Sequence, residues 1–209
     1  MRHIKTIITC LLIGLVLPEK IMAIEEIQYK ILKQHGDFEV RLYAPYLIAE
    51  TIVDAQFDEA GSDAFKVLFK YISGNNQSQQ DIAMTAPVAQ QGVGDKIAMT
   101  APVEQQKSSD KWAVSFMLPA FYTPTTVPEP INLDVKIREV PARYTASITY
   151  SGFWSESAYQ KHNKKLQQWI NDAGYEVIGE TVWARYNAPF TPWFLRRNEV
   201  LIPIEKPRL

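Results

Sequence analysis

A weak internal repeat constrains the fold of this chain more than any other feature. Val40 and Ala49 correspond to Ile137 and Ala146, each of which lies 97 residues further along the chain. Each match belongs to a unit that we interpret as strand, helix, strand and strand. One such unit has too few strands to bury its own apolar face. We therefore expect an α+β fold in which the two halves join into one sheet or barrel.

Apolar residues at three- and four-residue spacing predict one helix in each half. The first covers about 57–73, and the second covers about 155–173. Ser155 is suited to cap the second helix, and Glu156 is favourable in its first turn. The segments 68–72 and 166–170, one on each predicted helix, also match each other. The repeat thus includes the helices as well as the strands.

Apolar residues with period two predict the strands around these helices. The expected strands cover 38–42, 47–53, 112–118, 175–186 and 199–204. The first two are separate strands or one bent strand, because the alternation breaks at Pro45. A proline-rich connection from Pro119 to Pro130 leads into the second half.

The first 23 residues have the pattern of a secretory signal peptide. Arg2 and Lys5 precede an apolar run over 7–17, and Ala23 is a small residue suited to cleavage. The run is shorter than the roughly 20 apolar residues of a spanning helix. We predict an exported protein, periplasmic or secreted, with no stable membrane span after removal of the leader. An uncleaved anchor or an N-terminal helix is the alternative.

Composition excludes several functional classes. The only cysteine, Cys10, lies in the predicted leader, so residues 24–209 would have no disulfide, thiolate nucleophile or cysteine for covalent cofactor attachment. A net charge of -1 and the absence of a basic run argue against a nucleic-acid partner. The helix dipole explains the acidic pair Asp58-Glu59. No nucleophile–base or metal-ligand motif is present, so we predict that the protein is not an enzyme.

Five separated segments resemble the SOUL haem-binding family. They are FEVRLY at Phe38–Tyr43, LFKYISGN at 68–75, IAMTAPV, WAVSFMLP at 112–119 and RRNEV at 196–200. They occur in the family's order and cover nearly all of 24–209. Together with the predicted leader, they make the chain resemble an exported bacterial member of the family. The resemblance implies a distorted antiparallel β-barrel with two flanking helices. It also implies non-covalent binding of a tetrapyrrole, usually haem, in a shallow apolar cleft near the first helix.

The IAMTAPV segment occurs twice, at 82–88 and 97–103. The family pattern needs one copy. We expect one copy to form the strand and the other to extend a loop. The alternative is a hairpin of both copies, turned by 92–95.

Haem binding requires an apolar slot for the macrocycle and cations near its propionates. The predicted cofactor-binding residues are Phe65, Leu68, Phe69, Lys70 and Ile72 on the first helix, with Met84 and Met99 in the two IAMTAPV copies. Lys70 is the nearest cation on that helix. At least half of the helix hydrophobics must instead pack on the sheet, because one helix face has to cover it.

His35 and His162 are the candidate axial ligands of residues 24–209. Some family members have a histidine where this chain has Leu42, so ligation from that position is impossible. His35 also fits a solvated turn residue, and His162 fits a core or rim residue of the second helix. Methionine and tyrosine are further options. Haem held by apolar contacts, with a weak protein ligand or none, is the leading interpretation.

We thus expect a tetrapyrrole carrier, buffer or sensor. The alternative is a non-haem module that binds another planar apolar ligand or a protein partner on the same fold. Catalytic modification of a tetrapyrrole is a third hypothesis.

Overall fold

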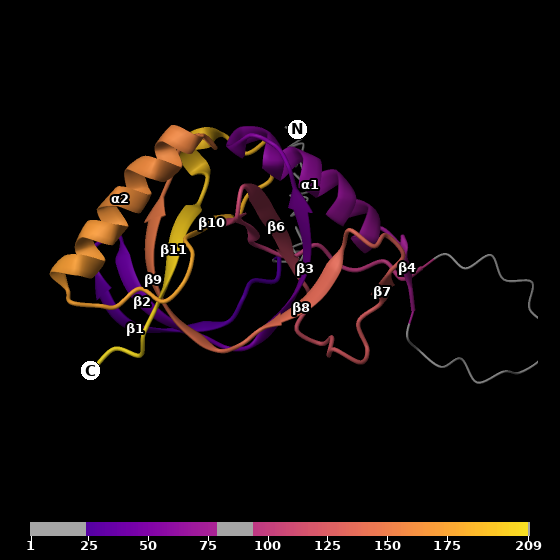
Figure 1. Ribbon diagram of the computed structural model, residues 1–209, viewed down its shortest axis with the longest axis horizontal. Helices are drawn as coiled ribbons and strands as arrows, with labels where there is room; N and C mark the ends of the chain where they lie inside the picture. Colours follow the sequence, from indigo (N-terminus) through magenta and orange to yellow (C-terminus); the bar gives the residue numbers. More distant parts are fainter. Residues whose placement is uncertain (1–23, 79–93, 209) are drawn as a thin grey trace, which may run out of the picture.

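The computed structural model describes residues 24–78 and 94–208 (Figure 1). The predicted leader and the first IAMTAPV copy, with Met84, lie outside the described residues. The helices are α1 (Phe57–Ile72) and α2 (Glu156–Asp172), with a short 3-10 helix at Trp193–Leu195. The strands are β1 (Tyr29–His35), β2 (Phe38–Tyr43), β3 (Tyr46–Val53), β4 (Asn76–Gln77), β5 (Val103–Ser108), β6 (Lys111–Met117), β7 (Glu129–Pro130), β8 (Lys136–Val140), β9 (Arg143–Tyr150), β10 (Val182–Arg185) and β11 (Asn198–Ile204).

Nine of these strands form one curled antiparallel sheet in the order β1-β2-β9-β11-β10-β5-β6-β3-β8, and β4 pairs with β7. The sequence repeat explains how the two halves join in one sheet. Val40 on β2 pairs with Ala146 on β9, and Ala49 on β3 pairs with Ile137 on β8. The matched residues of the two halves therefore exchange partners. This confirms the predicted α+β fold, a distorted barrel with two flanking helices (Figure 1).

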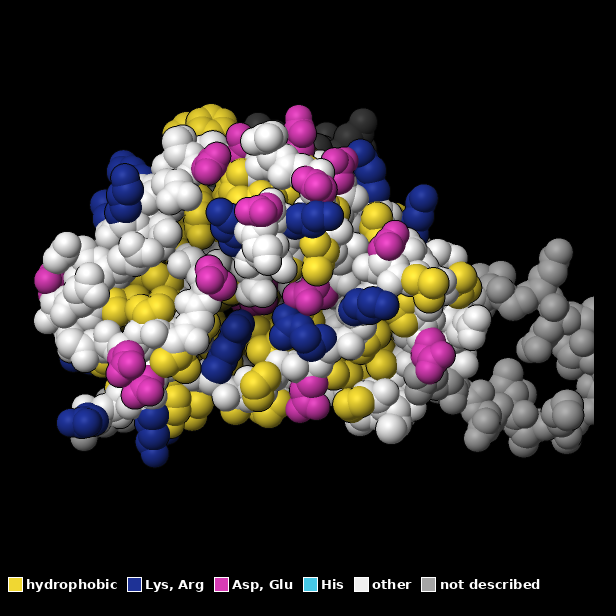
Figure 2. All heavy atoms as spheres, viewed as in Figure 1, with side chains coloured by type: hydrophobic (Ala, Val, Ile, Leu, Met, Phe, Trp, Pro, Cys, Tyr) yellow, Lys and Arg dark blue, Asp and Glu magenta, His cyan; other side chains and the backbone are white. Residues whose placement is uncertain are grey.

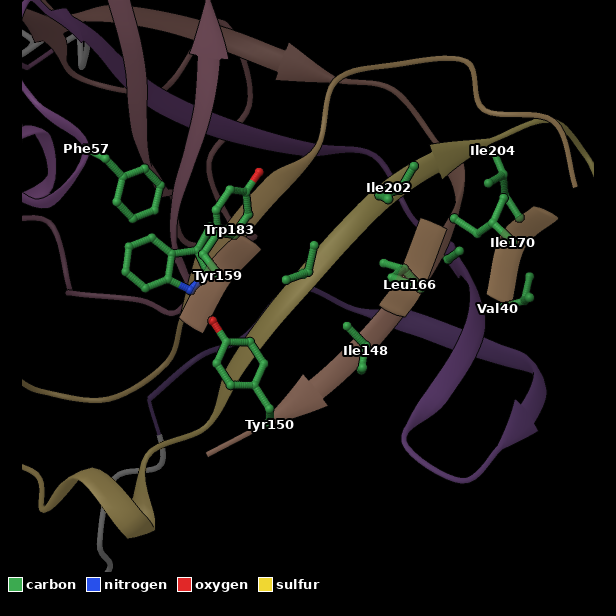
Figure 3. Close-up of a cluster of buried hydrophobic side chains, with 12 residues drawn as sticks. Val40, Phe57, Ile148, Tyr150, Tyr159, Leu166, Ile170, Trp183, Ile202 and Ile204 are labelled. Carbon is green, nitrogen blue, oxygen red and sulfur yellow. The ribbon is translucent and has the colours of Figure 1, made fainter. Parts of the chain in front are cut away.

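Each helix covers its own part of the sheet. α1 packs on β3 and β6, and α2 packs on β9 and β11. Under α2, Leu166 and Ile170 are fully buried against Val40 and Ile202 (Figure 3). The predicted helix bounds are confirmed within a residue. Ser155 caps α2 as expected, since its Oγ accepts a hydrogen bond from the Ala158 N–H at 3.3 Å.

The strands β1, β8 and β9 lie outside the expected ranges, and two of the expected segments also differ in the structure. The expected strand over 175–186 is reduced to β10, because 176–180 are exposed and only Val177 forms an isolated bridge, to Ile204. The second IAMTAPV copy is irregular, and its last residue, Val103, begins β5. Pro102 supplies no backbone N–H for a strand ladder.

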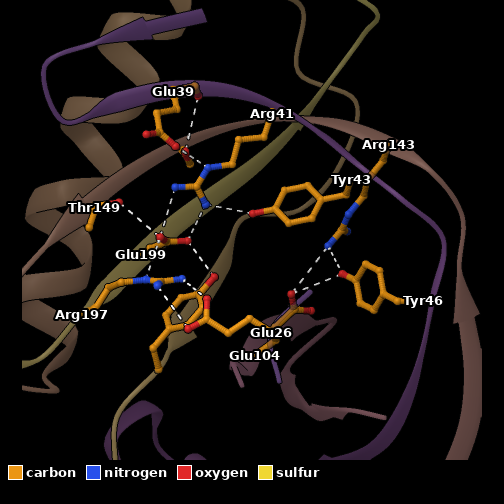
Figure 4. A network of polar contacts seen from close by, with 12 residues as sticks. Glu26, Glu39, Arg41, Tyr43, Tyr46, Glu104, Arg143, Thr149, Arg197 and Glu199 are labelled. Carbon is orange, nitrogen blue, oxygen red and sulfur yellow. Dashed lines mark hydrogen bonds and ion pairs between the residues drawn. The ribbon is translucent and has the colours of Figure 1, made fainter. Parts of the chain in front are cut away.

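The concave face of the sheet carries a buried polar network (Figure 4). Arg41 pairs with Glu199 at 2.7 Å and donates to the Tyr43 hydroxyl at 3.0 Å. Arg197 contacts Glu199 at 3.2 Å and Glu26 at 2.8 Å. These charges satisfy one another across β2, β11 and the N-terminal segment. The network therefore links these three parts of the chain, and removal of one partner would leave a buried charge uncompensated.

Candidate ligand-binding groove

A groove of about 460 Å³ lies where α1 meets the β9–α2 and β10–β11 connections. Its volume falls in the range of small-molecule sites, which is roughly 300–1,000 Å³. The starts of the two helices are joined there, because the Glu156 N–H donates to the Asp58 carboxylate at 3.1 Å. Figure 1 shows the N-terminal ends of both helices at the top, with the yellow β10–β11 connection between them. The groove thus combines residues from both halves of the repeat.

Aromatic side chains form much of the groove wall. Phe65 of α1, Trp154 of the β9–α2 connection and Trp183 of β10 all line it. Phe65 is fixed edge-on against Phe116 at 5.3 Å between ring centroids, and Trp183 stacks on Phe57 at 4.9 Å. Phe65, held in this way, offers a fixed apolar face to a planar ligand, whereas Trp183 is only 2% exposed and lies beneath the Arg185 guanidinium.

Arg185 is the most buried of the three charged residues that line the groove, the others being Asp58 and Lys66. Its guanidinium lies 4.8 Å from the ring centroid of Trp183 and 5.5 Å from that of Trp154. Its one hydrogen bond to a described side chain is a long one of 3.4 Å to Gln105. Among the described residues no carboxylate lies within ion-pair distance, and the Arg185 Nε has no acceptor. Burial lowers the pKa of this arginine to about 10.

Gly61 allows the guanidinium to occupy this place. A Cβ on Gly61 would lie 2.4 Å from the Arg185 Nη2, closer than real contacts allow. A buried cation without an anion costs free energy, whereas a ligand carboxylate entering the groove would neutralise it. The groove therefore has the chemistry to bind a flat apolar molecule with an anionic edge.

The predicted helix residues divide between the groove and the core. Phe65 lines the groove, whereas Leu68 and Ile72 are buried in the core between α1 and the sheet. Phe69 is 45% exposed and stacks on Phe65 at 5.6 Å, so it extends the aromatic surface outward. Lys70 is exposed and does not line the groove.

The IAMTAPV copy at 97–103 contributes to the groove through its last residue. Val103 lines the wall opposite α1, whereas Met99 is 43% exposed and is not among the lining residues. The groove cation on α1 is Lys66, which forms an exposed pair with Asp63 at 3.0 Å.

Neither candidate axial ligand lines the groove. His35 is exposed at the end of β1, opposite Phe38 in a hairpin. The His162 ring stacks on Tyr150 at 3.8 Å, and its Nδ1 lies 2.8 Å from the Ala158 carbonyl. Burial lowers the pKa of His162. Within 24–78 and 94–208, no three His, Cys, Asp or Glu side chains come together in a metal-holding group.

Sequence reasoning did not identify Trp154, Trp183 and Arg185 as site residues. One signal was available, since Arg185 directly follows the apolar run 182–184 within an expected strand. A charged residue in such a strand indicates a buried partner or a binding role.

Fold and groove together define a class: a curled antiparallel sheet from two repeats, with a ligand-sized aromatic groove beside α1. Residues 24–203 match the family model described as SOUL heme-binding protein. The chain belongs to the SOUL heme-binding protein family.

Two curated relatives have similar sequences. Heme-binding protein 2 of Homo sapiens is 28% identical over 183 residues, which covers 79% of this chain and 81% of the relative. Heme-binding protein 1 of Xenopus tropicalis is 29% identical over 166 residues, covering 78% and 81%. The match spans most of both proteins, so it concerns the whole domain.

Among solved structures, the crystal structure of the EcmrR C-terminal domain is similar, with a TM-score of 0.59 and 9% identity. The match covers 86% of this chain and 99% of that domain. At this identity the likeness concerns the fold. In the described part of the chain, no helix is both long enough and apolar enough to cross a membrane.

Proposed function

We propose that this protein binds haem or a related tetrapyrrole non-covalently in the groove, as a carrier, buffer or sensor. Membership of the family and the names of the curated relatives support this ligand class. The observation that carries the proposal is Arg185, a partly buried cation with no carboxylate partner among the described residues, set between the rings of Trp154 and Trp183.

The groove residues would contact different parts of the ligand. Phe65, Trp154 and Pro189 would contact the faces and edge of the macrocycle and exclude water from them. Arg185 would bind a propionate, whose negative charge offsets the cost of the buried guanidinium. Because neither His35 nor His162 lines the groove, we propose that haem is held without an axial histidine. The bound iron would then supply any redox chemistry.

A hemin titration tests the proposal. We expect a shifted Soret band that saturates near one equivalent, and the same spectrum in His35→Ala and His162→Ala. A titration indistinguishable from that of a protein of similar size outside this family would refute haem binding. A Soret shift that collapses in one histidine variant would identify an axial ligand and contradict the proposed binding mode.

The second candidate is a non-haem module for another planar anionic compound. The chemistry of Arg185 supports it, because a guanidinium can bind a carboxylate and cannot ligate a metal. A thermal-shift screen separates the two, since a bound ligand raises the unfolding midpoint. If hemin fails while other planar anions raise the midpoint, the non-haem function holds. We propose binding without catalysis. Recovery of unchanged haem after incubation is the expected result, and a converted tetrapyrrole would contradict it.

We further propose that the chain is exported, with cleavage after Ala23. Expression of the full chain followed by fractionation and N-terminal sequencing of the product tests this. A product that begins at Ile24 outside the cytoplasm is expected, and an intact cytoplasmic chain would contradict export.

A further inference from the structure

Large apolar side chains project into solvent beside the groove. We call this surface the aromatic tip; it consists of Phe153, Phe190, Trp193, Phe194 and Leu195. Phe190 is 88% exposed, and the other four are between about half and two-thirds exposed. Figure 2 shows hydrophobic side chains standing out at the top of the molecule, where Figure 1 places the β10–β11 connection. A contiguous apolar surface of this kind is characteristic of an interaction site.

The tip is held in place by its own backbone. Arg196 donates hydrogen bonds to the carbonyls of Thr191 and Pro189, at 2.8 and 2.7 Å. The Gly152 N–H donates to the Trp193 carbonyl at 3.1 Å, which ties the β9–α2 connection to the β10–β11 connection. The rings of Phe153 and Trp193 stack at 5.2 Å. The exposed rings are therefore pre-organised, which lowers the entropic cost of docking.

The composition of the tip fits a lipid surface. The segments 151–155 and 186–197 contain no acidic residue, and their one arginine outside the buried network is Arg196, because Arg197 pairs with Glu26 and Glu199. Phenylalanine and leucine enter the acyl boundary of a bilayer, tryptophan prefers its interface, and arginine approaches lipid phosphates. Asp58 and Glu156 belong to the adjoining helix starts, so binding should depend on apolar insertion more than on anionic lipid.

We propose that the aromatic tip inserts into the interfacial region of a phospholipid bilayer and places the groove at the lipid surface. The tip and the groove are continuous in the chain: Phe153 precedes Trp154, and Pro189 precedes Phe190, with Trp154 and Pro189 lining the groove. An apolar ligand dissolved in lipid then enters the groove without crossing water. This last step rests on the proposed function, whereas bilayer binding by the tip does not.

Sedimentation with phosphatidylcholine vesicles, with and without phosphatidylglycerol, tests the proposal. The test variant is Phe190→Ser/Phe194→Ser/Leu195→Ser, with Phe190→Ser alone as a milder change. The matched control is Phe121→Ser/Leu133→Ser, because these two side chains are 71% and 82% exposed and lie outside the tip. We expect binding to both kinds of vesicle, a fall of at least about tenfold in the triple variant, an intermediate fall in the single one, and no change in the control.

Three results would overturn bilayer docking. They are a wild-type chain that does not sediment with vesicles, a control variant that loses as much binding as the triple variant, and a wild-type dimer that the triple variant converts to monomer. The last would show that the tip joins two copies of this chain. A hemin titration of the triple variant without vesicles separates the two proposals. A triple variant that binds hemin but no longer binds vesicles supports both proposals. A wild-type chain that binds vesicles but not hemin refutes the proposed function alone.

Discussion

Replacing Arg185 by methionine should stabilise the ligand-free protein. The wild-type side chain holds a positive charge in an aromatic groove, with one long hydrogen bond of 3.4 Å to Gln105 and no carboxylate within ion-pair distance in the described residues. Methionine fills similar space, adapts to irregular surroundings and makes favourable contacts with rings such as Trp154 and Trp183. The substitution therefore removes a buried charge and retains most of the packing.

The pKa of Arg185 gives the size of the effect. Burial lowers this pKa to about 10, and each pKa unit corresponds to ~1.4 kcal/mol, so holding the charge in this partly exposed position costs at most roughly 3 kcal/mol. Loss of the guanidinium contacts with Trp154 and Trp183 offsets about 0.5–2 kcal/mol of this. We expect a net gain of about 1–2 kcal/mol in the free energy of unfolding. For a domain of this size the midpoint should rise by roughly 2–8 °C.

Urea and thermal unfolding of the ligand-free protein measure this change, with Arg41→Met as the matched control. Arg41 is also buried, but it pairs with Glu199 at 2.7 Å and Glu39 at 2.6 Å. Its removal leaves Glu39 without its cation and the buried Glu199 with Arg197 alone, and should destabilise by about 3 kcal/mol. Destabilisation of Arg185→Met by more than about 1 kcal/mol would refute the reasoning and make Arg185 a structural residue.

Two further substitutions test the groove and the network. Gly61→Ala should lower hemin affinity by about tenfold, because the new Cβ would displace the Arg185 guanidinium. The higher helix propensity of alanine should keep the melting midpoint within a few degrees of that of the wild type. Unchanged affinity in a hemin titration would contradict this prediction. Glu104→Gln should raise the melting midpoint at pH 7. Burial raises the pKa of Glu104, so the folded state favours the protonated carboxyl, and the stability that Glu104 contributes falls as pH rises through the folded-state pKa. Glutamine is neutral at every pH and avoids this loss. That advantage should disappear near pH 4, where the wild-type carboxyl is protonated, and melts across pH that show a constant difference would contradict it.

The fold could be predicted from the sequence because its signals are local or periodic. The apolar spacing of each helix and the alternation along each strand depend on neighbouring residues alone. The repeat adds a long-range constraint, and the exchanged pairs Val40–Ala146 and Ala49–Ile137 confirm that the halves share one sheet. The segment 175–181 was wrongly expected to be strand, because 176–180 are exposed and the regular strand β10 begins only at Val182.

The groove could be predicted only in part. Phe65 was identified because it lies on the flank of an amphipathic helix, and that flank does line the groove. The role of Arg185 depends on Gly61 and Trp154, which are distant in sequence and come together through the sheet order. No local sequence pattern indicates that these three residues lie close together in the fold. His35 and His162 attracted attention through their chemistry, and the fold places both away from the groove.

The most direct test of the central claim compares protoporphyrin IX with its dimethyl ester, using wild-type protein and Arg185→Met. The account predicts that the wild-type chain prefers the free acid by roughly 10–100-fold, the worth of one charge-assisted hydrogen bond. It also predicts that Arg185→Met binds both compounds with similar, weak affinity. Equal wild-type affinity for acid and ester, or an undiminished preference in Arg185→Met, would contradict the assignment of the groove as a site for an anionic tetrapyrrole.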